Sequence, residues 1–444
     1  MKRLLLSGLV LTAVVSAWGP PERVDRKPDN YVTYDNDIKV SRDGTPFIVW
    51  SECKRETYFE KVMFARRDHD TWTIPVNVSR DSGDLRQPTI TLDRNGMPIV
   101  VWTEYYTGRV RFVRFLGDSW SIPKLCFSTH YGWTPVLVTA PGGRVHLQFE
   151  KPGAPGVIWH SYYIPEADSW AKPCTVAYCP SDPLGWSDLT ADRNSHLHSV
   201  WMDYSTYGVG YAYNDGTGWS EPVQLPDPSR HQSCSPRIVC DSFCRPHVVW
   251  QEYSGGYPTY YTYFNGDSWS APLRLFSPGR PQICLDSFNL LQIIAGTMSY
   301  FVRVVRLDTA WSQVESLYPG GLFSFAVSRE LIHLLYSPSD FCLYYRCGSL
   351  LPGVEENGSE PNRCFRPIGF GSLRFVEFEL DYAEDVVIKL FESTGRCATR
   401  FYLGRMGAGR HRVRILDNSP GSGVRFVVVE AGKRVAGYKC ILVR

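Results

Sequence analysis

A tryptophan recurs at nearly constant spacing through the first three quarters of this 444-residue chain. Each copy follows a short turn-like stretch, and successive copies are 48, 50, 49, 50 and 42 residues apart. The six copies are Trp72, Trp120, Trp170, Trp219, Trp269 and Trp311. A second aromatic landmark lies upstream in most units, at Trp50, Trp102, Phe149, Trp201 and Trp250. A repeat of this length restricts the chain to a few repeat architectures.

Each unit divides into four apolar, β-branched or aromatic runs separated by turn residues. In the second unit these runs are Thr89–Asp93, Pro98–Glu104, Val110–Leu116 and Trp120–Phe127. The string Asp93-Arg94-Asn95-Gly96 predicts a tight hairpin turn, because a calcium loop would need further ligands and a closing Glu that are absent. No apolar period of 3.6 residues is sustained. Four strands in about 48 residues predict an all-β fold, a β-propeller.

The number of blades follows from the length of the repeat region. Asp37 to Pro352 spans 316 residues, which gives about 45 residues for each of seven blades. The last unit has lost its tryptophan, so six blades with a connecting segment remain open. An N-terminal strand near Tyr31–Val40 is expected to close the ring by pairing with the last blade, since an unpaired edge would be exposed.

Charge excludes one class of partner. The chain has 47 Lys and Arg against 45 Asp and Glu, without a dense basic stripe. Neutralising phosphates requires such a stripe, so we expect no nucleic-acid binding.

The N-terminal residues 1–17 have the order of a secretory signal peptide: a basic start, an apolar run and the small residues Val15-Ser16-Ala17. An N-terminal membrane anchor is the alternative, but the run is short for a bilayer. We therefore expect a secreted or cell-surface protein without a membrane span in its mature chain. The expected organisation is a signal peptide over 1–17, a propeller over 18–352, a linker over 353–365 and a separate domain over 366–444.

Thirteen cysteines fit an oxidising compartment. Close pairs that could form disulfides are Cys174 with Cys179, Cys240 with Cys244, and Cys342 with Cys347. The chain has no C-x-x-C pair and no histidine at zinc-ligand spacing. We expect no metal and no other cofactor.

The units resemble bacterial neuraminidase repeats, which form the sialidase-type propeller. The strings from Arg66 to Trp72 and from Asp215 to Trp219 resemble degenerate forms of its S-x-D-x-G-x-T-W box. In that family the box lies on the face opposite the active site, so the resemblance implies a fold without implying catalysis. The six repeated tryptophans are accordingly expected to fill the space between blades.

The region after the linker resembles the Ig-like C-terminal sorting domain of type IX secretion cargo, which is also similar to an Ig-like domain of the flagellar hook-capping protein. The matching segments are 387–396, 407–413, 422–426 and 439–444. Arg425 stands where that family usually has Tyr, and Glu392 where it usually has Asp. The resemblance implies a small β-sandwich and the secretion machinery as a partner. A plain Ig-like accessory domain without sorting activity is the alternative.

Loops from the second to the third strand and from the fourth to the next first strand emerge on one face of a propeller, which we call the mouth. Acids and aromatic residues recur there in register, and this pairing suits sugars because carboxylates accept hydroxyl hydrogen bonds while rings pack on sugar faces. The predicted ligand-binding residues are Glu52, Glu104, Tyr105, Trp133, Trp186, Asp203, Tyr204, Glu252 and Tyr253. The acids could instead simply solvate the rim.

Two function classes remain. The first is a binding module for an extracellular glycan or protein ligand, which needs only a shaped aromatic mouth. The second is a sialidase-like glycoside hydrolase, which needs essential carboxylates or an arginine cluster; Arg86, Arg237 and Arg280 begin first strands and could clamp an anionic sugar. We favour the binding module and assign no catalytic residue.

Overall fold

The computed structural model describes residues 18–349 and 365–442, with internal gaps at 29, 57–58, 70, 82, 152, 228–230, 278, 287–288, 298, 308–309, 313, 318–319, 329–330, 370–374, 381–382, 393–396, 415–422 and 432–433. Strands account for 61% of the residues and helix for 1%. Among the described residues the one helical element is the 3-10 turn η1 (Pro165–Ala167). The predicted signal segment 1–17 and most of the predicted linker lie outside the described residues.

Seven sheets form the seven blades of a propeller, so the larger of the two expected blade counts is correct. The innermost strands are β2 (Tyr31–Val40), β7 (Leu85–Leu92), β11 (Trp133–Thr139), β16 (Leu184–Ala191), β20 (Ser233–Cys240), β24 (Arg280–Leu285) and β29 (Leu322–Val327). The second strands are β3 (Pro46–Lys54), β8 (Pro98–Glu104), β12 (Val145–Lys151), β17 (Leu197–Asp203), β21 (Pro246–Glu252), β25 (Leu291–Gly296) and β30 (Leu331–Ser337). The third strands are β4 (Glu60–Asp68), β9 (Arg109–Arg114), β13 (Gly156–Ile164), β18 (Val209–Asn214), β22 (Thr259–Tyr263), β26 (Phe301–Leu307) and β31 (Tyr344–Ser349).

The outermost strands are short, and in blades 1, 3 and 6 each is split into two pieces that pair with the same third strand. They are β5 (Thr71–Trp72) with β6 (Val76–Asn77), β10 (Lys124–Leu125), β14 (Ser169–Trp170) with β15 (Cys174–Cys179), β19 (Val223–Gln224), β23 (Leu273–Phe276), β27 (Ala310–Trp311) with β28 (Glu315–Leu317), and β1 (Glu22–Arg23).

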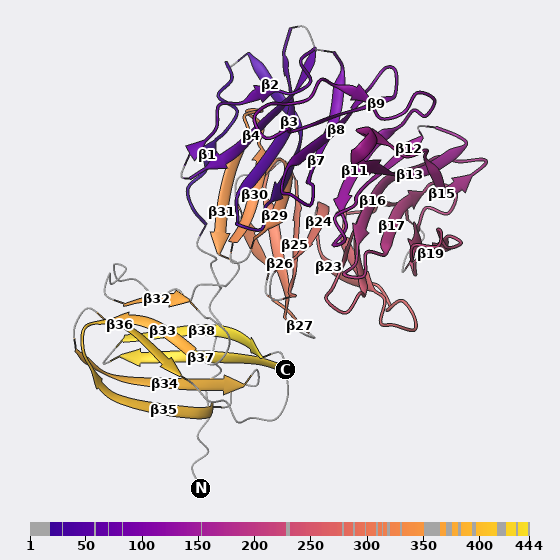
Figure 1. Cartoon of the computed structure of the whole chain (residues 1–444). Coiled ribbons are helices and arrows are strands. Elements are labelled where there is room, and N and C mark those ends of the chain that lie inside the picture. The colour runs from indigo at the N-terminus through magenta and orange to yellow at the C-terminus, as the bar shows by residue number, and fades with distance from the viewer. Residues whose placement is uncertain are drawn as a thin grey trace. The chain divides into compact units, whose positions relative to one another are not determined.

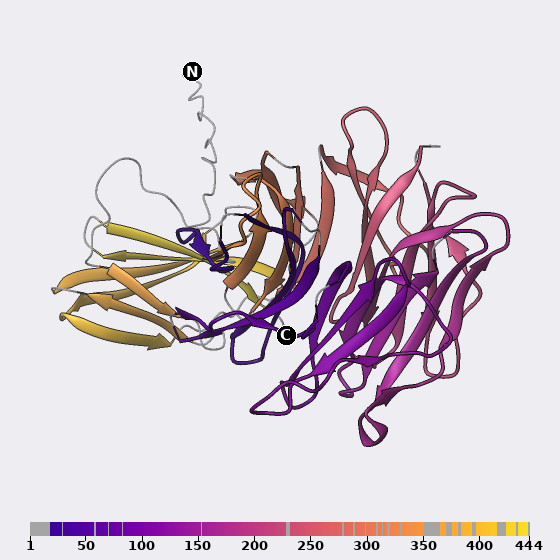
Figure 2. The ribbon, with the colours of Figure 1, turned by 90° about the horizontal axis from the view of Figure 1, so that it is seen from above.

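The ring closes through β1, an N-terminal strand that completes the last blade. The innermost strands contact one another in sequence, and β2 contacts β29. The outer strand of the seventh blade is β1, whose Glu22 and Arg23 pair with β31, so the indigo strand β1 lies beside the orange strands of the last blade (Figure 1 and Figure 2). The expectation that Tyr31–Val40 pairs with the last blade was wrong, because that segment is the innermost strand of blade 1. Trp18 bridges to Gly348 of β31 and so takes the tryptophan position that the seventh unit lacks.

Aromatic rings hold the blades together. The second-strand tryptophans Trp50, Trp102, Trp201 and Trp250 are buried in their blades. The outer tryptophans pack edge-on against a ring of the preceding blade, as Trp120 does on Phe64 with ring centres 4.8 Å apart. Trp72 does the same on Tyr345, 5.0 Å away, across the closure of the ring. The repeated tryptophans therefore fill the interfaces between blades, and each such pair adds about 0.5–1.5 kcal/mol beyond its burial.

The turn between the first two strands is built as its sequence suggested. In blade 2 the Asp93 carboxylate accepts hydrogen bonds from the amides of Asn95 (2.8 Å) and Met97 (2.9 Å), and Gly96 has a φ of 77°. Only glycine adopts that φ without strain. The segment Asp93-Arg94-Asn95-Gly96 is therefore a hairpin turn, as predicted.

The ten cysteines whose side chains the structure describes are free thiols, unlike the disulfides that their spacing suggested. Cys174 and Cys179 show the reason, because they are the two ends of the six-residue strand β15. An extended strand separates such ends by about 16 Å, far beyond disulfide reach.

The described C-terminal strands form two sheets. One consists of β32 (Phe365–Gly369), β33 (Phe375–Leu380) and β36 (Gly409–Arg414), and the other of β35 (Cys397–Met406), β34 (Glu384–Glu392), β37 (Gly423–Ala431) and β38 (Arg434–Leu442). Leu380, Val386, Ile388 and Val429 are buried in this unit. In the described part of the chain, no helix has the length and apolarity needed to cross a membrane.

Candidate functional site

The acids predicted at the ends of the second strands have partners close by in sequence. Glu52 is buried, and the indole of Trp50 donates to its Oε2 at 3.1 Å. Burial raises the pKa of Glu52. Glu104 contacts the guanidinium of Arg111 and accepts a hydrogen bond from Thr107 Oγ1 at 2.9 Å.

The other two acids have the same kind of surroundings. Asp203 accepts from the amide and hydroxyl of Ser205 (2.9 and 2.6 Å) and from Gln224 Nε2 at 2.7 Å. Glu252 is 2% exposed and accepts from Ser254 Oγ at 3.2 Å. A side chain two positions beyond a strand residue lies on the same face, so each acid shares the buried face of its tryptophan. These contacts support a structural contribution from all four.

The predicted aromatic residues fall into smaller groups at the mouth. Tyr105 stacks on Trp133, with ring centres 4.9 Å apart and planes inclined by 14°. Tyr253 is 62% exposed and packs edge-on against Tyr257. Tyr204 lies close to Gly185, the residue before Trp186. Tyr105 and Trp133 therefore form a stacked aromatic pair at the mouth.

A β-bulge interrupts the innermost strand at the same register in the first five blades. In four of them a residue other than glycine occupies the left-handed region: Gln87 (54°), Thr134 (50°), Trp186 (52°) and Ser235 (52°). Such a φ costs about 1–2 kcal/mol per residue and concentrates at functional sites. The bulges were not predicted, and the trace they leave in the sequence is a recurrent proline at Pro88, Pro135 and Pro236.

Hydrogen bonds between blades hold this ring of bulges in place. Asp35 Oδ2 accepts from the amide of Gln87 (2.9 Å), and Gln87 Oε1 accepts from the amide of Thr134 (2.8 Å). Thr134 Oγ1 then donates to Glu150 Oε1 at 2.6 Å, and Glu150 Oε2 accepts from the amide of Ser187 at 3.3 Å. The inner rim of blades 1 to 4 is thus a connected and preorganised polar network.

Two arginines flank the mouth. Arg86 Nε lies 2.7 Å from Asp84 and 3.1 Å from Glu60, and its guanidinium lies over the ring of Tyr105. Arg280 is exposed, lies 4.8 Å from the centre of the Trp186 ring, and makes no salt bridge with any described residue.

The charges of both arginines act on one half-buried carboxyl, that of Asp35. Burial raises the pKa of Asp35, while the charges of Arg86 and Arg280 oppose that shift. Asp35 therefore lies within electrostatic reach of both cations.

Two further acids have pKa values near neutrality, and the predicted set contained neither. Burial raises the pKa of Glu60 to about 8 and that of Glu150 to about 7. Glu60 begins a third strand, where nothing in the repeat singles it out. Carboxyls of this kind can remain protonated at neutral pH and donate a hydrogen bond or a proton. Within the described residues no three His, Cys, Asp or Glu side chains are placed to hold a metal ion.

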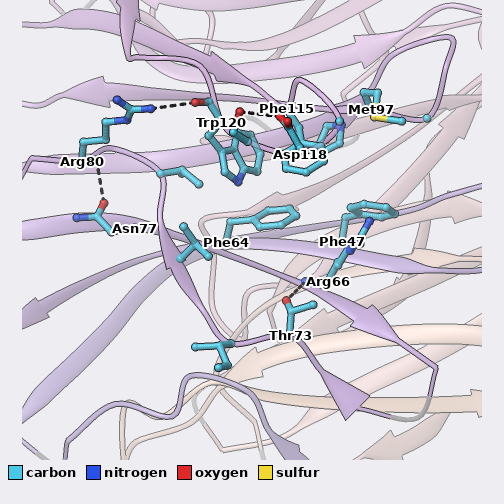
Figure 3. Close-up of a pocket in the computed structure, with 17 residues that line it drawn as sticks. Phe47, Phe64, Arg66, Thr73, Asn77, Arg80, Met97, Phe115, Asp118 and Trp120 are labelled. Atoms are coloured by element: carbon cyan, nitrogen blue, oxygen red, sulfur yellow. Dashed lines mark hydrogen bonds between the residues drawn. The ribbon is translucent and has the colours of Figure 1, made fainter.

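A separate hollow of about 500 Å³ lies between blades 1 and 2, lined by the outer strand of blade 1 and by two turns of blade 2, at 96–98 and 117–119. Its walls include Phe64, Phe115 and Trp120, and Arg66 and Arg80 lie among its lining residues (Figure 3). This hollow was not among the predicted sites.

Comparisons with known proteins bear on the fold. No protein-family model matches the chain, and no curated protein matches it. Among solved structures it is similar to the polysaccharide lyase Uly1, with a TM-score of 0.52 and 10% identity over 78% of this chain and 94% of that one. It is also similar to a polysaccharide lyase, an ulvan lyase bound to -[GlcA(1-4)Rha3S]-, with a TM-score of 0.51 and 12% identity over 75% of this chain and 94% of that one.

A third similar structure carries a different chemistry. A fungal alcohol oxidase in complex with copper has a TM-score of 0.52 and 12% identity, covering 96% of this chain and 100% of that one. The class that these observations define is a seven-bladed β-propeller with structural neighbours among polysaccharide lyases. Because one fold hosts both lyases and an oxidase, function must be argued from the mouth itself.

Proposed function

We propose that this chain is a secreted or cell-surface propeller that binds glycans at its mouth. The observation that carries the proposal is the stacked pair Tyr105 and Trp133 beside Arg86, with a second ring, Trp186, under Arg280. Aromatic faces pack on the apolar faces of sugars, and guanidinium groups donate to hydroxyl or acidic oxygens. The polysaccharide-acting neighbours support a glycan ligand over other small molecules.

A glycan array followed by calorimetry on the purified chain tests the proposal. Substituting Trp133→Ala or Trp186→Ala should weaken binding of an array hit about tenfold, which corresponds to roughly 1.4 kcal/mol. Phe243→Ala is the matched control, because Phe243 is an exposed ring 5.0 Å from Arg245 in a first-to-second-strand turn, away from the mouth. If no glycan binds, the glycan proposal fails and a protein ligand at the mouth is favoured.

Glycan cleavage, by a sialidase-like glycoside hydrolase, is the second candidate. The raised pKa values of Glu60 and Glu150 favour it, because a general acid must be protonated near neutral pH. A panel of fluorogenic glycosides separates the two functions. Turnover that Glu150→Gln abolishes while binding persists would establish cleavage, whereas binding without turnover of any glycoside supports a binding module.

We also propose that residues 366–444 address the protein to type IX secretion after export through the signal peptide. The proposal rests on the four matching segments described above. Deleting residues 366–444 in the native host should leave the propeller in the periplasm. Normal surface display of the shortened protein would refute the sorting role.

A further inference from the structure

The interface between blades 1 and 2 differs from the next interface at equivalent positions. The repeat defines these positions: the amide of Arg66 donates to Thr73 Oγ1 as that of Arg114 donates to Ser121 Oγ, both at 3.1 Å. Val76 pairs with Phe64 as Lys124 pairs with Phe112. Phe115 pairs with Trp120 as Tyr163 pairs with Trp170.

A carboxylate occupies the interface between blades 2 and 3. Asp168 lies 2.8 Å from Arg114 Nε and 2.5 Å from Lys124 Nζ, and Tyr163 Oη donates to it at 2.5 Å. Asp168 follows η1 and has a φ of 44°, which turns it toward these partners. One acid thus satisfies three polar groups at this interface.

The interface between blades 1 and 2 has the equivalent arginine, Arg66, but lacks the lysine, the tyrosine hydroxyl and the paired aspartate. Val76 replaces the lysine, and Phe115 replaces the tyrosine. The equivalent aspartate, Asp118, is exposed and accepts from the neighbouring Ser119 Oγ at 2.8 Å. Arg66 is exposed and makes no salt bridge with any described residue. Beside these residues the first interface has the hollow of about 500 Å³, and both Arg66 and Asp118 are among its lining residues.

The walls of this hollow suit an apolar group. Phe64 and Phe115 pack edge-on against Trp120, with ring centres 4.8 and 5.5 Å away. The exposed side chains of Ile74 and Val76 extend the apolar lining. Figure 3 shows the rings gathered in the hollow and Arg80 reaching the carbonyl oxygen of Trp120, to which it donates at 2.9 Å. The volume lies within the range of small-molecule sites.

We propose that this hollow binds a small organic carboxylate with an aromatic or alkyl body. The carboxylate pairs with Arg66 as Asp168 pairs with Arg114, and the apolar body packs against Phe64, Phe115 and Trp120. Arg80 adds a second positive charge at the rim. None of the predicted mouth residues lines this hollow, so Trp133→Ala should leave binding of the acid unchanged.

Calorimetry on the full chain tests this site with two matched probes, 4-phenylbutyrate and 4-phenylbutan-1-ol. The acid should bind at least about tenfold more tightly than the alcohol, because a hydrogen bond to a charged group is stronger than one to a neutral group. Arg66→Gln should remove that difference, and Val76→Trp should remove binding of both probes by filling the hollow. Arg109→Gln, an exposed arginine at the mouth end of the neighbouring blade, is the control and should change nothing.

Arg66 is exposed, so the Arg66→Gln variant is expected to fold, and its circular dichroism should match that of the wild type. Equal affinity for acid and alcohol in the wild type would refute the role of Arg66. Absence of binding of either probe at millimolar concentration would refute the site. Loss of acid binding in the Trp133→Ala variant would also refute it, since the acid would then be bound at the mouth.

Discussion

Asp168 lies between Arg114 and Lys124, 2.8 Å from the guanidinium of one and 2.5 Å from the ammonium of the other. The contact joins blade 3 to blade 2 and has no counterpart at Asp118, one repeat earlier. Two aspartates at equivalent positions of one repeat therefore have different surroundings, and stability measurements can separate them.

Replacing Asp168 by Ala should lower the free energy of unfolding by about 1–2 kcal/mol. Removing the carboxylate leaves two cations without their partner, but all three groups are partly exposed and water screens them. Asp118→Ala should change it by less than about 0.5 kcal/mol. Urea denaturation of the two variants checks the difference, and equal effects would contradict the assigned contacts.

Acid should destabilise the propeller. Burial lowers the pKa values of His146, His198 and His333 to about 4, and that of His160 to about 3. An unfolded histidine titrates near 6.5, so protonation below that pH favours the unfolded chain, by up to about 1.4 kcal/mol per pH unit for each residue. The free energy of unfolding should fall between pH 6.5 and 4. Denaturation at pH 6.5 and 5 checks this, and His333→Asn should reduce the slope by about one proton. An unchanged slope would contradict the assignment.

Alkali should destabilise it through two carboxyls. Glu60 and Glu150 hold protons in the folded state up to about pH 8 and 7, whereas unfolded glutamate loses its proton near 4.3. Their contribution is fully present below the unfolded pKa and is lost as pH rises through the folded one. Between pH 4.5 and 6.5 the stability lost through these two carboxyls as pH rises opposes the stability gained through the histidines. The histidines are more numerous, so the free energy of unfolding should peak near pH 6.5. Glu60→Gln should flatten the decline between pH 7 and 8, and a parallel curve for wild type and variant would contradict this.

A tryptophan between blades should contribute more to the free energy of unfolding than a tryptophan at the mouth. Trp170 is buried against Phe112, so Trp170→Ala should lower the free energy of unfolding by about 3–5 kcal/mol. Trp133 is half-buried at the mouth, and Trp133→Ala should cost much less. Thermal and chemical denaturation check the pair, and a larger loss at Trp133 would make it a packing residue.

The fold was largely predictable because burial between blades imposes one large ring per repeat. The spacing of the tryptophans from Trp72 to Trp311 predicted the repeat length, and that length predicted four strands in each unit. The closing strand was missed because Glu22–Arg23 has only two residues and no repeat of its own. The seventh unit lacked a tryptophan for the same reason: its outer strand and Trp18 come from the other end of the chain.

The mouth was less predictable. The position of Tyr105, Trp133 and Trp186 near the mouth follows from the repeat, since Tyr105 comes directly after β8 while Trp133 and Trp186 lie at the start of β11 and β16; ligand binding by them stays a prediction. The burial of Glu52 and Glu252 was not predicted, although the alternation along a strand already places each acid on the same face as its tryptophan. Asp35 and Arg280 are 245 positions apart in sequence, and only closure of the ring brings them within electrostatic reach.

Amide hydrogen exchange with and without the best array glycan tests the central claim most directly. Ligand at the mouth should protect amides of the bulges and the loops beside them, near residues 86–89, 104–109, 133–136 and 185–188, and should leave the turn at 117–121 unchanged. Protection confined to 117–121, or no protection at saturating glycan, would contradict the mouth as the binding site.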